Sequence, residues 1–157
     1  MAPAEQYPER GMKVTLLLAD YAHVADGKLY VMGGGWTFTG PQPVPFALAG
    51  IIEVPWHQAN RKHTFRLELL DLDGQEIHVD TPEGEQPLFF EGEFEVGRMP
   101  GLKEGVGIPF PFALNSGPVP LPPGGHYEWR LTMDGKQHED WRLAFSTRPG
   151  DAQSQAA

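Results

Sequence analysis

The chain has 157 residues, of which 40% are hydrophobic, and it contains 19 glycines and 16 prolines. This length suits one domain with a sizeable core, and so many turn-forming residues exclude long helices. The absence of cysteine excludes disulfides and thiolate sites, and a net charge of -9 excludes binding to phosphate backbones or anionic lipid surfaces. We therefore expect a cytoplasmic protein with neither nucleic acid nor membrane as a partner.

Apolar patterning begins at Met12 and ends at Thr147. We expect one β-domain over residues 12–147, a flexible N-terminal extension over residues 1–11 and a disordered C-terminal tail over residues 148–157. The apolar run Val14–Ala19 is too short for a signal peptide or a membrane span, so it is predicted to be a buried strand.

The pair Asp26-Gly27 separates the β-prone segments Lys13–Val24 and Lys28–Phe38. Both turn residues tolerate the positive φ of a tight hairpin, which predicts that these segments pair. The triplet Gly33–Gly35 lacks the Lys-Ser/Thr pair and the helix of a phosphate loop, so it indicates a bulge or a sharp bend.

The segment Phe46–Val54 is apolar on both faces, which is typical of a central strand. Four aromatic residues flank the proline-rich stretch at residues 40–45 and the strand after it: Trp36, Phe38, Phe46 and Trp56. Aromatic rings beside rigid prolines either close the end of a sandwich or form a hydrophobic groove for a partner. We treat these four residues as the candidate binding site.

The pair Asp73-Gly74 predicts a second hairpin, between His63–Leu72 and Gln75–Val79. Further along, Phe90, Phe94 and Val96 alternate with glutamates, which indicates a half-buried strand. Its outer face would carry the acidic stripe Glu91, Glu93 and Glu95.

The segment Ile108–Leu114 contains two prolines in alternation with apolar residues. Residues two apart in a strand direct their N–H groups to the same side, so Pro109 and Pro111 remove donors along one edge. This strand is predicted to lie at the border of a sheet, where prolines discourage edge-to-edge association.

The pair Asp134-Gly135 predicts a third hairpin, between Tyr127–Met133 and Trp141–Phe145, with the polar segment Lys136–Asp140 lengthening the loop. Tyr127, Trp129, Leu131 and Met133 share one face of the first of these strands. Counted along the chain, these segments predict an all-β fold, an antiparallel β-sandwich of about eight or nine short strands.

Two stretches carry a resemblance to a known family. The run K-V-T-L-L-L-A-D-Y-A-H-V-A-D-G-K-L-Y-V-M-G-G-G at Lys13–Gly35, with Trp36 and Glu53-Val-Pro-Trp56, resembles a family of small bacterial proteins of uncharacterised function. The similarity extends through Leu121–Tyr127 to the last hairpin. It implies one bacterial domain and supplies no ligand or catalytic residue.

The run Pro122-Pro-Gly-Gly-His-Tyr-Glu-Trp129 is similar to the penultimate strand of immunoglobulin-like sandwiches. In those domains a tyrosine near the start of the strand bonds back to a neighbouring corner. Tyr127 would be that residue here.

Candidate catalytic and metal-binding residues are sparse. Neither Ser116 nor Ser146 has a G-x-S-x-G context, and the six histidines form no H-x-H or H-E-x-x-H pair. A loop-built metal site could still gather four residues: His57, His63, Asp71 and Asp73. Because the Asp-Gly turn already explains the aspartates, we expect no metal, no cofactor and no catalytic residue.

The sequence therefore favours a non-enzymatic binding or assembly module that recognises a protein partner or forms a homo-oligomer. Two alternatives stay open. One is a small-ligand- or metal-dependent enzyme with a loop-built site, and the other is a structural component of a phage or tail-like particle.

Overall fold

The structure is a computed structural model and describes residues 11–150. The expected N-terminal extension, except Gly11, and the expected tail beyond Gly150 lie outside the described residues.

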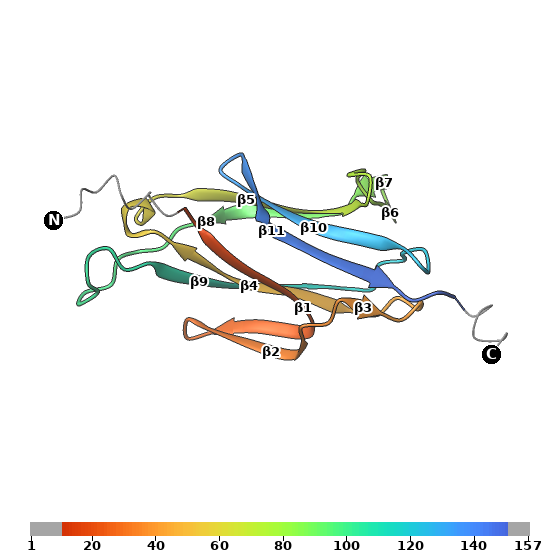
Figure 1. Cartoon of the computed structure of the whole chain (residues 1–157), viewed down its shortest axis with the longest axis horizontal. Helices are drawn as coiled ribbons and strands as arrows, with labels where there is room; N and C mark the ends of the chain where they lie inside the picture. Colours follow the sequence, from red (N-terminus) through yellow and green to blue (C-terminus); the bar gives the residue numbers. More distant parts are fainter. Residues whose placement is uncertain (1–10, 151–157) are drawn as a thin grey trace.

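Two main sheets form the body of the described residues (Figure 1). The four-stranded sheet has the order β2-β1-β4-β9, with β1 (Lys13–Ala25), β2 (Lys28–Gly34), β4 (Phe46–Val54) and β9 (Ile108–Ser116). The five-stranded sheet has the order β3-β11-β10-β5-β8, with β3 (Phe38–Thr39), β5 (His63–Asp71), β8 (Phe89–Phe94), β10 (His126–Met133) and β11 (Lys136–Thr147). All neighbours are antiparallel except β3 and β11. The predicted all-β antiparallel sandwich is confirmed.

The core lies between these two sheets because alternate residues of each strand point inward. Trp129 of β10, 1% exposed, is the largest fully buried side chain. Its ring centroid lies 6.1 Å from that of Phe46 and 5.8 Å from that of Phe90, so it contacts strands of both sheets. A 3-10 turn at Trp56–Gln58 follows β4, and none of the helical structure in residues 11–150 could cross a bilayer.

The first and third predicted hairpins are confirmed. Asp26, Gly27, Asp134 and Gly135 all have positive φ, as two-residue turns of this type require. In the third hairpin β11 already begins at Lys136, directly after the turn, so the expected longer loop is wrong. The polar segment is strand instead, and the pairing shifts register between Arg130 and Thr132.

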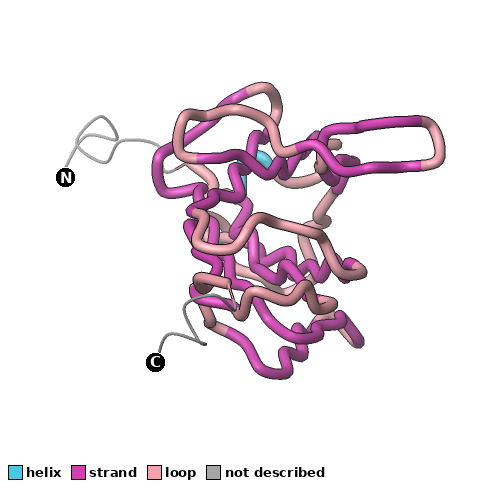
Figure 2. The backbone as a smooth tube through the Cα atoms, turned by 90° about the vertical axis from the view of Figure 1, so that its right-hand side faces the viewer, coloured by secondary structure: helices cyan, strands magenta, loops and turns pink. Residues whose placement is uncertain are grey.

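The second predicted hairpin is largely wrong. The turn forms, and Leu70 bridges Glu76, but the chain then leaves β5. It forms a separate hairpin of β6 (His78–Thr81) and β7 (Gly84–Pro87), which projects from the body of the sandwich (Figure 2). The neighbour of β5 is β8, whose Glu91, Glu93 and following Glu95 are exposed as predicted.

The sequence-based placement of three strands is confirmed. β1 and β4 are the central strands of their sheet, and β9 lies at its border. β9 pairs with β4 continuously through Pro109 and Pro111. Since a proline has no N–H to give, both prolines turn their nitrogen atoms to the free side of β9.

The β1–β2 hairpin forms a partial third layer on the outer face of the four-stranded sheet (Figure 1). β1 pairs with β4 over Lys13–Ala19 and with β2 over its second half. That second half packs Ala22 and Leu29 of the hairpin against small residues of the sheet, namely Ala19, Ala47, Ala49 and Ala113. The side-chain amide of Asn115 on β9 holds the backbone N–H and C=O of Ala22, at 3.3 and 2.7 Å.

Candidate functional site

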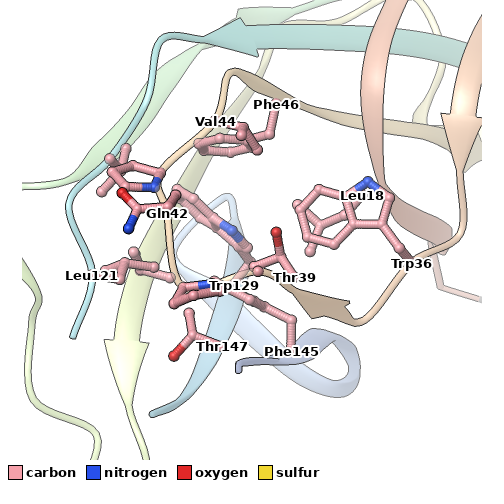
Figure 3. Close-up of a pocket in the computed structure, with 15 residues that line it drawn as sticks. Leu18, Trp36, Thr39, Gln42, Val44, Phe46, Leu121, Trp129, Phe145 and Thr147 are labelled. Carbon is pink, nitrogen blue, oxygen red and sulfur yellow. The ribbon is translucent and has the colours of Figure 1, made fainter. Parts of the chain in front are cut away.

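An apolar pocket opens at the end of the sandwich where β4 begins and β11 ends (Figure 3). Its volume is about 40 Å³. The residues that line it are Leu18, Trp36, Thr39, Gly40, Pro41, Gln42, Pro43, Val44, Phe46, Leu69, Val119, Leu121, Trp129, Phe145 and Thr147.

The pocket combines a rigid core wall with a proline-rich loop. Trp129 and Phe145 belong to the buried core, so they cannot retreat from a bound group. Trp36 stands on one side of the opening and Gln42 and Leu121 on the other, as Figure 3 shows. Pro41 and Pro43 hold the loop between β3 and β4 in few conformations, because each ring fixes its own φ.

Two indole N–H groups in this wall are buried without a hydrogen-bond acceptor among the described residues: Nε1 of Trp36 and Nε1 of Trp129. A buried donor without a partner costs about 1–3 kcal/mol. The core therefore keeps two tryptophans at the pocket despite this cost, where aliphatic residues would bury no unpaired donor.

A tyrosine corner fixes the segment that supplies Leu121. The hydroxyl of Tyr127 donates to the carbonyl oxygen of Pro122 at 3.1 Å, and the hydroxyl of Thr147 donates to the same oxygen at 2.8 Å. The N–H of Gly125 donates to the Thr147 hydroxyl at 2.9 Å. Burial raises the pKa of Tyr127, and the charge of Asp71 raises it further, against the lowering effect of the bond with Thr147. The expected role of Tyr127 is confirmed by this geometry.

The structure brings only part of the sequence-predicted binding site together. Trp36 and Phe46 both line the pocket. Phe38 is next to it but outside its lining, half-exposed, with the Arg148 guanidinium 4.9 Å from its ring centroid. Trp56 follows the far end of β4, where the Arg98 guanidinium lies over its ring at 4.6 Å and donates to its carbonyl oxygen.

The four candidate metal ligands do not converge. His63 begins β5 and Asp71 ends it, about 26 Å away at 3.3 Å per residue, while His57 lies in the 3-10 turn before β5. Asp71 uses Oδ1 to accept the N–H groups of Asp73 and Gln75, which is a turn interaction. Within residues 11–150 no three potential ligands gather.

Buried His63 has a structural environment instead. It is 2% exposed, with Nδ1 2.7 Å from Oδ2 of Asp134 and Nε2 2.8 Å from the carbonyl oxygen of Gln58. Both partners are acceptors, so the pair is fully satisfied when both ring nitrogens carry hydrogen. Burial acts to raise the pKa of Asp134, but the hydrogen bonds from His63 and Thr64 and the charges of His63 and Arg61 lower it overall.

One serine does contact a histidine. Ser146 on β11 lies opposite His126 on β10, with Oγ 2.7 Å from Nδ1. This is the distance of a nucleophile and its base, but no carboxylate of the described residues forms an ion pair or hydrogen bond with His126. Ser116 donates to the adjacent Gly117 carbonyl.

Sequence reasoning missed Trp129 as a pocket residue. Its alternation with Tyr127 and Leu131 correctly predicted that it points inward. Its position beside Phe46 depends on how the two sheets pack face to face, because Trp129 and Phe46 belong to different sheets.

A comparison with curated proteins finds no match. Residues 14–146 match the signature of a protein family. Because this match covers most of the chain, the protein belongs to that family, which is described as a family of unknown function (DUF6941).

Proposed function

We propose that this bacterial, cytoplasmic protein is a non-enzymatic binding module whose pocket receives an apolar side chain of a partner protein. The observation that carries the proposal is an open apolar pocket built on buried Trp129 and bordered by Trp36 and Phe46. Large aromatic residues in a rigid pocket are typical of the residues that dominate protein interfaces.

The size of the pocket favours a side chain over a cofactor. A volume of about 40 Å³ holds about three water molecules, at 10–15 Å³ each. A small branched side chain can occupy that space, while most of a larger ligand would stay outside. The proline-rich loop is already restricted, so binding would order little additional backbone.

The alternative of a loop-built enzyme receives less support. The serine and histidine at the last hairpin lack an orienting acid among the described residues, and the metal candidates lie at two ends of β5. A binding module needs none of these groups.

A peptide-display selection against the full chain tests the proposal. We expect enriched peptides to share an apolar residue and to lose binding at least about tenfold, or 1.4 kcal/mol, to Val44→Asp, which places a charge at the pocket mouth. Val44 lines the pocket and is 49% exposed, so the substitution leaves the core intact.

Val106→Asp is the matched control, since Val106 is 41% exposed and lies outside the pocket lining. It should bind the selected peptides as the natural chain does. Failure to enrich any peptide, or equal losses in both variants, would count against the proposal.

We infer in addition that the sandwich is immunoglobulin-like. Two features support this. Tyr127 forms a tyrosine corner on the penultimate strand, β10. The short β3 follows β2 of the four-stranded sheet but pairs in parallel with β11, the last strand, in the other sheet. Domains of this type carry many unrelated functions, so the inference concerns the fold alone.

A further inference from the structure

The outermost strands of the two main sheets differ in how they are protected against pairing with another chain. β9 carries two prolines, β3 has two residues, and β8 exposes Glu91 and Glu93. Each of these is a known way to prevent edge-to-edge association. β2 has no proline and no acidic residue over Lys28–Gly34.

The geometry of the hairpin turn identifies which backbone groups of β2 are free. Asp26 and Gly27 form a two-residue turn, so Ala25 and Lys28 are the hydrogen-bonded closing pair. Every second pair then bonds across the hairpin, which leaves the N–H and C=O groups of Leu29 and Val31 directed outward. Among the described residues β2 pairs only with β1.

The opposite edge of the same hairpin is partly occupied. Ala22, opposite Val31, also directs its backbone groups outward, and there the side chain of Asn115 satisfies both of them. On the β1 edge the groups of Ala22 are therefore satisfied and those of Val24 point outward, whereas on β2 the groups of both Leu29 and Val31 are free of partners among the described residues.

The solvent face of the hairpin is apolar and aromatic. Tyr21, His23, Tyr30 and Met32, which we term the tyrosine face, lie on the side away from Ala22 and Leu29. Tyr21 and Tyr30 are about half exposed and Met32 is 64% exposed. The centroid of the His23 ring lies 4.9 Å from that of Tyr30, on which it stacks, and 5.7 Å from that of Tyr21. These rings therefore hold one another in place without a partner.

We propose that β2 pairs with β2 of a second copy of this chain in an antiparallel arrangement centred on Tyr30. In that register Leu29 of each copy meets Val31 of the other, and their outward groups form four backbone hydrogen bonds across the two-fold axis. The two Tyr30 rings meet on the tyrosine face, where side chains of a non-hydrogen-bonded pair lie closest.

The β2 edge is self-complementary in this register, and its charges do not oppose a second copy as the occupant. The chain carries a net charge of -9, which repels copies from most directions. The β2 edge has only Lys28, and the antiparallel register sets each Lys28 opposite an uncharged Met32. The two lysines lie at opposite ends of the contact, so no like charges face each other. The exposed glutamates of β8 belong to the other sheet.

Sedimentation velocity of the full chain over a wide range of concentration tests the pairing. We expect a species of twice the 17.4 kDa chain mass that forms as concentration rises. Met32→Lys should weaken dimerisation at least about tenfold, because it places a second lysine opposite each Lys28.

Met99→Lys is the matched control, with the same substitution at a residue of 66% exposure outside the hairpin. It should dimerise as the natural chain does, and so should Val44→Asp, because the pocket takes no part. A strictly monomeric natural chain, or equal weakening in both lysine variants, would overturn the proposal.

Amide hydrogen exchange distinguishes edge pairing from any other contact through the tyrosine face. The amides of Leu29 and Val31 should exchange slowly in the dimer and rapidly in Met32→Lys. A dimer in which both amides exchange as fast as in the monomeric variant would also overturn the proposal.

Discussion

Replacing Asp134 should reveal how much one carboxylate contributes to the stability of the sandwich. Asp134 joins two elements, since Oδ2 contacts His63 Nδ1 at 2.7 Å and Oδ1 accepts the N–H of Thr64 at 3.0 Å. Asp134→Ala removes both interactions and leaves the 2% exposed imidazole without one acceptor. A hydrogen bond of a charged group contributes about 1.5–3 kcal/mol and a neutral one about 1.

The backbone adds to this cost. Asp134 has φ 50°, where alanine is less stable than aspartate or asparagine by about 1 kcal/mol. Because the carboxylate is 41% exposed, solvent screens its charge, so we take the lower end of each range. We expect Asp134→Ala to lower the free energy of unfolding by about 3 kcal/mol, or about 6–12 °C in Tm.

Two variants separate the causes. Asp26→Ala introduces the same change at the same turn position, φ 52°, where no hydrogen bond to the side chain is present within the described residues. It should cost only the backbone part, about 1 kcal/mol. Asp134→Asn keeps the turn and a hydrogen-bonding group at His63, and should also lose about 1 kcal/mol by removing the charge.

The assay is urea denaturation of all four proteins between neutral and acid pH. The pKa of Asp134 is lowered on folding, so its contribution is fully present above its unfolded value of 3.8 and is lost as pH falls through the folded value. The difference between the natural chain and Asp134→Asn should therefore shrink in acid. If Asp134→Ala costs no more than Asp26→Ala, the reasoning about the His63 pair is wrong.

Two further predictions concern packing and the tyrosine corner. Tyr127→Phe should lower the free energy of unfolding by about 1 kcal/mol in urea denaturation, because the Pro122 carbonyl loses one of two donors; an unchanged midpoint would show that the corner is not stabilising. Gly50→Ala should lower it by about 1–3 kcal/mol, because the added methyl would meet the Thr15 carbonyl oxygen and the Phe112 ring. Gly40→Ala, where nothing lies within 4 Å, is its control and should leave thermal melting unchanged.

Features that depend on local chemistry were predictable from the sequence. Asp-Gly turns indicated two hairpins, and Pro109 and Pro111 indicated a border strand, because turn geometry and missing donors act within a few residues. The same logic failed after Asp73-Gly74. There the Asx turn of Asp71 forms as the residues suggest, but β8 displaces the returning segment from β5.

The candidate site was only half predictable for a related reason. Trp36 and Phe46 lie near each other along the chain and both reach the pocket. Trp56 is as near to Phe46 in sequence, yet a nine-residue strand carries it to the opposite end of the molecule. Once Phe46–Val54 is recognised as one strand, that separation follows from strand length alone.

The alanine-lined contact beneath the β1–β2 hairpin implies that the hairpin layer and the sandwich core open at different free energies. Ala19, Ala22, Ala47 and Ala49 are completely buried, yet each removes little apolar area from water, and the larger side chains packed against them are Leu17 and Leu29. The free energy gained there is small compared with that of the layer around Trp129. The outer part of the hairpin, which is β2 with the second half of β1, therefore opens at a lower free energy than the sandwich core, while the pairing of β1 with β4 over Lys13–Ala19 persists.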